Sequence, residues 1–334
     1  MFRELFRNLT RNVGIPMEAD GVGAGPVSRL ISRPTLGRSS HLPTAALTVL
    51  LLALTACPGR GPSSEDILRS RRELELAAAL QQENNIPGAI GHLRTALELD
   101  AENAEAHLLL ALIHFVNRNN PPLAEEHARR GVEILVEQER HGSTLAEARN
   151  ILGTILIARG KYEEAVAILE RSAMDDMNTS PHLAWGNLGL AYLEAGRPAD
   201  AVEPLETAVR AQPRFCVGYH RLGRAYYELD ELERAEAALV QAIEADESCA
   251  DNPLLQNAWR LRGEVRARLG HRDEALADLE RCVALNPRTE DGAACQRLLD
   301  RTPTHPTPDD AGAQDPPSIE PSSAQAQPAQ GDAR

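Results

Sequence analysis

Three histidines are the side chains of this sequence that come nearest to a chemical site. His107 and His114 stand seven residues apart, which places both on one face of a helix, and His127 falls in the following helical segment. Imidazoles gathered in this way can bind a transition metal or transfer a proton. Packing of neutral histidines between two helices is the alternative interpretation of the same pattern.

Motifs that indicate catalysis are absent from the sequence. It contains no phosphate-binding loop, no Gly-x-Ser-x-Gly turn and no His-Glu-x-x-His zinc motif. Acidic pairs such as Glu163-Glu164 are expected on solvated helix faces. We therefore expect a protein that is not an enzyme, with no metal, no cofactor and no small-molecule substrate.

The charge of the chain is unevenly distributed. Only six of the 35 basic residues and three of the 49 acidic residues lie in residues 1–56, so the remainder carries a net charge of −17. A surface this acidic repels nucleic acid, and we expect no nucleic-acid partner. Aromatic residues make up 3% of the chain, and the abundance of Ala and Leu favours helices packed through small and medium side chains.

The apolar run AALTVLLLALT occupies residues 45–55 and follows three arginines. It is too short for a permanent membrane span, and its basic flank is typical of an export signal. Residues 54–57, LTAC, resemble the lipobox of bacterial lipoproteins at all four positions. That resemblance implies that Cys57 is acylated and that a peptidase then cleaves the bond before it.

We therefore predict that residues 1–56 are an export signal and that residues 57–69 are a lipidated cysteine with its tether. Pro58 stands where an Asp would resemble an inner-membrane retention signal, so we expect attachment to the outer membrane, on its periplasmic side. Residues 1–37 exceed what such a leader needs. Initiation near Val27 or Leu36 is the alternative to a start at residue 1.

A segment of 34 residues recurs along the chain and decides the fold. The best copy, residues 182–215, has Trp185, Gly189 and Tyr192 on its first helix and Ala201 and Leu205 on its second. Small residues are needed where two antiparallel helices approach most closely, and large ones fill the space on either side. This pattern resembles the tetratricopeptide repeat at nearly every characteristic position.

The resemblance implies an all-α fold, a right-handed α-solenoid of about six repeats over residues 70–300. We place the copies near 70–103, 104–135, 146–179, 182–215, 216–249 and 256–289, with a linker at 136–145 and a capping helix at 290–300. Neighbouring repeats share one core along such an array. Residues 301–334 are rich in Pro, Ala and Gln, and we expect them to be disordered.

Four cysteines remain after Cys57, and an even number in an exported protein permits disulfides. Three pairings are possible, and we favour Cys282–Cys295 and Cys216–Cys249. The first would join the last repeat to the capping helix, and the second would connect equivalent ends of neighbouring repeats. A metal site is the alternative, although no Cys-x-x-Cys spacing supports it.

The resemblance also implies where a partner would bind. In this repeat family the first helices line a concave groove, and their positions 2, 5, 9 and 12 face inward. Those positions give a candidate partner-binding groove of Leu108, Leu112, Phe115, Asn150, Thr154, Ile157, Leu183, Leu190, Leu193, His220, Arg224, Tyr227, Arg260 and Glu264. An apolar strip that becomes charged at one end suits a peptide or an amphipathic helix. Burial of these leucines by adjacent helices is the alternative.

The lipobox followed by six repeats is similar to the plan of the type IV pilus pilotin lipoproteins, the PilF, PilW and Tgl group. That resemblance covers about residues 57–300. It implies a protein client, an outer-membrane secretin, whose insertion or multimerisation the lipoprotein promotes. The alternative is an envelope adaptor lipoprotein that recruits peptidoglycan hydrolases or other assembly factors, because repeat solenoids are general binding scaffolds.

Overall fold

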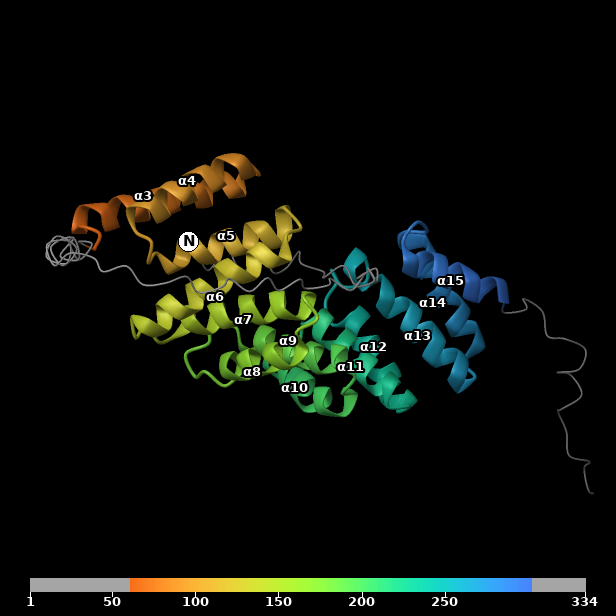
Figure 1. Ribbon diagram of the computed structural model, residues 1–334. Helices are drawn as coiled ribbons and strands as arrows, with labels where there is room; N and C mark the ends of the chain where they lie inside the picture. The colour runs from red at the N-terminus through yellow and green to blue at the C-terminus, as the bar shows by residue number, and fades with distance from the viewer. Residues whose placement is uncertain (1–60, 302–334) are drawn as a thin grey trace, which may run out of the picture.

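The computed structural model describes residues 61–301, with only the backbone described at Leu254. Six consecutive helix pairs are followed by a final helix (Figure 1). The pairs are α3 (Ser64–Gln82) with α4 (Ile86–Leu99), α5 (Ala104–Leu112) with α6 (Pro121–Glu137), α7 (Ser143–Ala158) with α8 (Tyr162–Ala173), α9 (Pro181–Glu194) with α10 (Pro198–Ala211), α11 (Cys216–Glu228) with α12 (Leu232–Glu244), and α13 (Gln256–Leu269) with α14 (Arg272–Leu285).

The final helix is α15 (Glu290–Arg301). Two short elements complete the chain: the π-helix η1 (Ile113–Asn117) continues α5, and the 3-10 helix η2 (Pro253–Leu255) precedes α13. The described residues contain thirteen α-helices and no strand, so the predicted all-α solenoid with a terminal capping helix is confirmed. None of these helices is long and apolar enough to cross a membrane.

Several predicted boundaries differ from the structure. Helix α3 begins at Ser64, so residues 64–69 are helical and not part of a tether. The serine before it explains this start: Ser63 forms a capping box with Asp66. The linker predicted at 136–145 is shorter, because α6 ends at Glu137 and α7 begins at Ser143.

Other predictions lie outside the described residues. These are the export signal, Cys57 with the adjoining residues up to 60, and the tail from residue 302 onward. Arg301, which we assigned to that tail, is the last residue of α15.

Repeats 2 to 6 each pack their two helices through a glycine on one helix and a leucine on the other. Gly189 of α9 faces Leu205 of α10, and Gly223 of α11 faces Leu239 of α12. A β-carbon on Gly223 would lie 2.6 Å from Leu239 Cγ, which is closer than real contacts allow. The small residue therefore sets the distance between the two helices.

The turn between the two helices of every repeat contains one residue with a positive φ. Glycine fills it in three repeats, with φ between 68° and 87° at Gly160, Gly196 and Gly270. Asn84, Asn119 and Asp230 fill it in the others. These residue types tolerate the left-handed conformation best, which explains why each first helix ends there.

Neighbouring pairs share apolar clusters along the array. Repeat 1 packs with α5 in one cluster, repeats 2 to 4 form a second and repeats 4 to 6 a third, and α15 covers the end in a small fourth cluster with Cys295. The helices form a curved row with α3 and α4 at one end and α15 at the other (Figure 1).

A buried carboxylate joins repeat 2 to repeat 3. Glu125 of α6 is only 6% exposed, and its oxygens lie 2.8 Å from Arg129 NH2, 3.2 Å from Arg159 Nε and 2.6 Å from Lys161 Nζ. Burial raises the pKa of Glu125, but the hydrogen bonds from Lys161 and Arg129 outweigh it and leave that pKa below its ordinary value. Arg159 and Lys161 belong to the turn between α7 and α8.

Candidate protein-binding surface

The apolar half of the predicted groove belongs largely to the core. Leu108, Leu112, Ile157, Leu190 and Leu193 are all buried. Leu108 packs onto Gly131 of the second helix in its own repeat, which positions it between the two helices. The expectation that these five side chains contact a partner is therefore wrong, and burial by adjacent helices, the alternative, describes them. Phe115 and Leu183 remain partly exposed.

The first helices of repeats 3 to 5 are joined by a polar ladder, which we define as Asn150, Thr154, Asn187 and Arg221. Asn187 Nδ2 donates to Asn150 Oδ1 at 3.0 Å and to Thr154 Oγ1 at 3.1 Å. Asn187 Oδ1 in turn accepts a hydrogen bond of 3.0 Å from Arg221 NH1. The ladder thus connects α7, α9 and α11 through consecutive side chains.

A second group of bonds connects α11, α13 and α15. Arg260 Nε donates to Asp291 Oδ1 at 2.8 Å, and Tyr227 OH donates to Glu264 Oε2 at 3.1 Å. Arg260 also pairs with Glu264, at 2.5 Å. Three of the predicted groove residues of repeats 5 and 6, Tyr227, Arg260 and Glu264, therefore meet, and Asp291 of the capping helix joins them.

Two further predicted residues are held by their neighbours. Arg224 of α11 pairs with Glu194 of α9 at 2.6 Å and with Glu228 at 2.7 Å. Burial lowers the pKa of Arg224, but its carboxylate partners outweigh it, so that pKa is raised above its ordinary value. His220 Nε2 lies 3.0 Å from Asn257 Oδ1, and burial lowers the pKa of His220 to about 4, so this imidazole is neutral at pH 7.

Arg221 differs from the other arginines of this surface. Among the residues that the structure describes, no carboxylate lies within ion-pair distance of its guanidinium, and its hydrogen bond goes to the neutral amide of Asn187. Burial lowers the pKa of Arg221 to about 10, against a weaker opposing effect of Glu194. It remains a cation at pH 7 with donors to spare, so this part of the surface favours an oxygen-rich, anionic partner group.

The sequence pattern missed two members of the ladder, Asn187 and Arg221. Both stand at the sixth position of their 34-residue repeats, and the positions carried over from the family were 2, 5, 9 and 12. A signal was nevertheless present, because the two are polar and stand one repeat length apart at a position next to the buried helix face.

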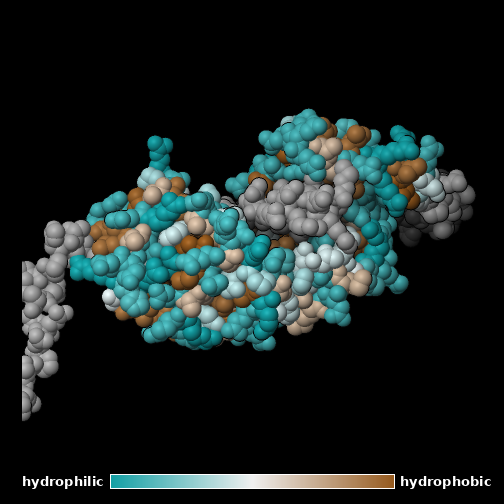
Figure 2. Space-filling model, turned by 180° about the vertical axis from the view of Figure 1, so that it is seen from behind, coloured by the Kyte–Doolittle hydropathy of each residue, from teal (hydrophilic) through white to brown (hydrophobic). Residues whose placement is uncertain are grey.

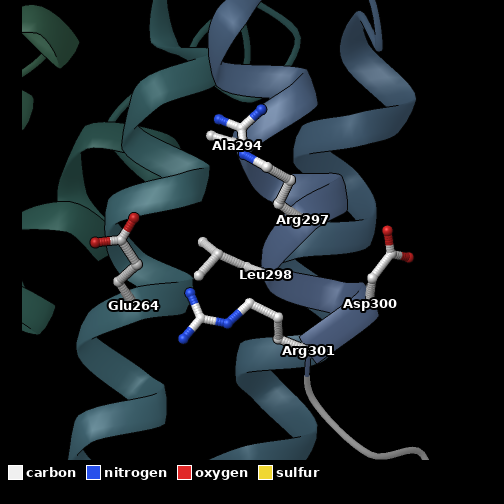
Figure 3. Close-up of a pocket in the computed structure, with 6 residues that line it drawn as sticks. All are labelled: Glu264, Ala294, Arg297, Leu298, Asp300 and Arg301. Carbon is white, nitrogen blue, oxygen red and sulfur yellow. The ribbon is translucent and has the colours of Figure 1, made fainter.

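An open pocket of about 440 Å³ adjoins the second group of bonds. Glu264 of α13 lines one side, and Leu298, Arg297 and Arg301 of α15 line the other (Figure 3). Leu298 and Arg301 extend toward α13, whereas Asp300 points away from it (Figure 3). The pocket continues the polar surface as far as the end of the array.

The three histidines do come together in repeat 2. His107 Nδ1 lies 3.0 Å from His127 Nδ1, and the ring of His114 stacks on that of His127 with centroids 5.7 Å apart. His107 Nε2 lies 3.3 Å from the Ala101 carbonyl oxygen, which can only accept, so a neutral His107 donates from Nε2 to that oxygen. Its Nδ1 then accepts a hydrogen bond from His127 Nδ1–H. No group of three metal-binding side chains is arranged to hold a metal ion in the described part of the chain.

Both favoured disulfides are present in the structure. Cys216 at the start of α11 is bonded to Cys249, which precedes η2, and their Cα atoms are 5.9 Å apart. Cys282 of α14 is bonded to Cys295 of α15, with Cα atoms 6.2 Å apart. Both Cα–Cα distances lie within the range that a disulfide bond requires.

Hydrophobic areas are small and separate on the face drawn in Figure 2, so exposed apolar residues form no continuous groove on that face. The large exposed hydrophobic side chains in the described residues are Leu68, Leu76, Val116, Val136, Met174 and Met177. The polar surface of the first helices therefore remains our candidate binding surface.

Family models described as tetratricopeptide repeat match residues 74–135, 152–214, 218–249 and 257–289, which is more than half of the chain. Among characterised proteins, the type IV pilus assembly protein PilF of Pseudomonas aeruginosa is 32% identical over 173 residues, covering 50% of this chain and 66% of PilF. The heat shock protein STI1 of Saccharomyces cerevisiae is 29% identical over 87 residues, 26% of this chain and 15% of STI1. The chain thus spans just under two thirds of PilF and a small part of STI1.

Two solved structures share the fold. A structure of Pseudomonas aeruginosa PilF has a TM-score of 0.57 and 23% identity, covering 70% of this chain and 100% of that one. A structure of PilW, described as a widely conserved type IV pilus biogenesis factor, has a TM-score of 0.57 and 21% identity, covering 68% and 98%. With the repeat matches, these likenesses show that the chain belongs to the tetratricopeptide repeat family and is similar to PilF and PilW.

Proposed function

We propose that this chain is a lipoprotein of type IV pilus assembly, anchored to the periplasmic side of the outer membrane through a lipid on Cys57, that binds secretin subunits and promotes their insertion or multimerisation. The similarity to PilF, a type IV pilus assembly protein, supports a role in pilus assembly. The secretin client is the one that the resemblance to pilotin lipoproteins implies. The observation that carries protein binding is Arg221, a half-buried cation on the first-helix surface whose hydrogen bond goes to an amide and not to a carboxylate.

A mechanism follows from the polar ladder. The amide nitrogen of Asn187 donates hydrogen bonds to Asn150 and Thr154, which fix its side chain. Its oxygen accepts a hydrogen bond from Arg221 and so holds that guanidinium in place. A carboxylate or a row of carbonyl oxygens on the client would accept the remaining N–H groups of Arg221. The fixed geometry lowers the entropy lost on binding. Lipid on Cys57 would keep the solenoid where the secretin inserts.

The first test is a crosslinked pull-down of the anchored protein from its own bacterium, followed by mass spectrometry, with Cys57→Ser as a control for the anchor. We expect an outer-membrane secretin in the wild-type sample and less of it with Cys57→Ser. Recovery of peptidoglycan hydrolases without a secretin would favour the adaptor function. Normal secretin multimers and normal pili in a deletion strain would contradict the proposal.

A matched pair of variants tests the surface itself. Arg221→Gln keeps an N–H donor for Asn187 but removes the charge, and we expect it to reduce client capture about tenfold, as loss of one charged contact typically does. Arg171→Gln changes an exposed arginine of α8, on a second helix, and should capture the client like the wild type. Equal capture by the two variants would exclude the Arg221 surface as the binding site.

A further inference from the structure

Helix α3 presents an outer face that no described helix covers. It is the first helix of the array, at the end of the curved row (Figure 1), and it packs on α4 and α5. Ser70, Ala77 and Ala78 are buried on its inner side. On the opposite side, Leu68 and Leu76 are each 50% exposed.

The two exposed leucines and an arginine form one stripe. Leu68, Arg72 and Leu76 follow one another at four-residue spacing, which aligns them along the helix surface. Arg72 makes no ion pair with any residue that the structure describes. The exposed Arg69, Arg71, Glu65 and Glu75 border the stripe, so with Arg72 the exposed charges of this helix face sum to +1. Exposed leucines on a face with a net positive charge suit a membrane interface, where apolar side chains enter the acyl boundary and cations meet lipid phosphates.

The position of α3 in the chain points to the same occupant. Seven residue steps separate Cys57 from Ser64, so the chain between them spans at most about 25 Å. A lipid on Cys57, which is part of the proposed function, would hold the start of α3 within that distance of the bilayer. A contact too weak to bind a free protein is sufficient at the high effective concentration that such a tether creates.

The other exposed apolar pair lacks these features. Met174 and Met177 lie in the turn between α8 and α9 and enclose Asp175 and Asp176. Anionic lipid would repel that pair, as it would the acidic surface of the molecule as a whole. The stripe on α3 combines exposed leucines, unpaired positive charge and closeness to the anchoring cysteine.

We propose that the stripe Leu68–Arg72–Leu76 of α3 is a membrane-contact surface that lies on the anionic lipid leaflet to which Cys57 is anchored. The contact orients the solenoid, with repeat 1 against the lipid and the row of helices leading away from it toward α15. This inference depends on the proposed lipid anchor.

The test uses the processed form that begins at Cys57, which retains every described helix. The other four cysteines are in disulfides, so Cys57 can be coupled to vesicles of phosphatidylethanolamine and phosphatidylglycerol that carry some maleimide lipid and some brominated phosphatidylcholine. Leu76→Trp reports on the stripe, and Met174→Trp is the matched control on an exposed position away from it. The parent chain, with Trp185 and Trp259, supplies the background emission.

We expect brominated lipid to quench about half of the added emission of Leu76→Trp, because an interfacial side chain lies near the acyl boundary, and to leave Met174→Trp unchanged. Adding Arg72→Glu to Leu76→Trp should weaken the quenching. Equal quenching of the two added tryptophans by brominated lipid would overturn the proposal. A blue shift of Leu76→Trp without quenching would show protein–protein contact and would also overturn it.

Chemical coupling makes the result independent of acylation in the cell. The mass of the Cys57 peptide from the native membrane tests the anchor, and the pull-down tests the client. Failure of either leaves the vesicle result interpretable, and a negative vesicle result leaves the proposed client untouched.

Discussion

At the residue scale, glycines within the helices differ in whether the packing requires them. Gly223 sets the distance between α11 and α12, since a β-carbon there would lie 2.6 Å from Leu239 Cγ and 3.4 Å from the Ala235 carbonyl oxygen. Gly91 on the second helix α4 has no atom within 4 Å of where its β-carbon would be. The same amino acid is therefore required at one position and replaceable at the other.

Substituting both glycines separates these tasks. We expect Gly223→Ala to lower the free energy of unfolding by about 1–3 kcal/mol through overpacking, and Gly91→Ala to raise it by about 0.5–1 kcal/mol through better helix propensity. Urea denaturation followed by circular dichroism measures both changes. A stable Gly223→Ala variant would mean that α11 and α12 can move apart at little cost.

The histidine cluster predicts how stability depends on pH. Burial, then the neighbouring His107 and His114, lower the pKa of His127 to about 4. Burial is also the largest cause that lowers the pKa of His107, where Ala101 and Glu126 oppose it and Arg130 adds to it. Burial, Arg118 and Arg94 lower the pKa of His114. The folded state thus favours neutral imidazoles relative to the unfolded state.

The sign of the pH effect follows from these directions. The unfolded chain binds protons near pH 6.5 and the cluster binds them only at lower pH, so stability is lost as the pH falls from 6.5 toward 4. We expect His127→Gln to lose less thermal stability than the wild type between pH 7 and pH 4.5, and the exposed His141→Gln to follow the wild type. Parallel curves for all three chains would show that the cluster contributes little to acid sensitivity.

At the element scale, α15 depends on its disulfide. It follows the last repeat and buries only Gly292 and Cys295, so few apolar contacts hold it apart from those of Leu298 and Leu299. The bond from Cys295 to Cys282 closes a loop of 13 residues. A loop of this length corresponds to about 3 kcal/mol of stabilisation in the chain-entropy model.

We therefore expect Cys282→Ser with Cys295→Ser to speed amide hydrogen exchange in α15 selectively, at least tenfold, as loss of more than about 1.4 kcal/mol would. The matched control is Cys216→Ser with Cys249→Ser, which removes the bond between α11 and the segment before η2. That pair should leave exchange in α15 unchanged. If α15 keeps its protection from amide hydrogen exchange after Cys282→Ser with Cys295→Ser, packing alone holds the helix.

The helices could be predicted from the sequence wherever a residue type recurs because the packing of every repeat requires it. Gly189, Gly223 and the alanines opposite recur at 34-residue spacing because every repeat needs the same close approach, and the six pairs follow from that period. The start of α3 depends on Ser63 and Asp66, a local cap outside the repeat pattern. The groove was harder to predict. Whether Leu108 or Leu190 is buried depends on the helices that pack against it, and the position of a residue within its repeat does not give those contacts.

At the scale of the whole molecule, the array separates its interactions along its length. Repeat 1 carries the exposed stripe on α3, repeats 3 to 5 carry the polar ladder, and repeat 6 with α15 carries the pocket beside Glu264. Because each repeat contacts mainly its neighbours, a change in one part has little effect on another part several repeats away. We therefore expect a Leu76 variant to change membrane contact without changing client capture, and an Arg221 variant to do the reverse. A variant with both changes should show both effects, each as large as in the single variant.

The ion cluster around Glu125 has a practical consequence for chemical labelling. Lys161 is the one lysine in the sequence, and its ammonium is engaged with Glu125 at 2.6 Å. A reagent that acylates lysine amines therefore has a single side chain to modify, and modification removes one of the three cations around a buried carboxylate. Such a reagent loosens the junction of repeats 2 and 3 instead of marking the binding surface. Carboxylate-directed or photoactivated reagents avoid that damage, and they suit a chain whose surface is dominated by arginine and acidic side chains.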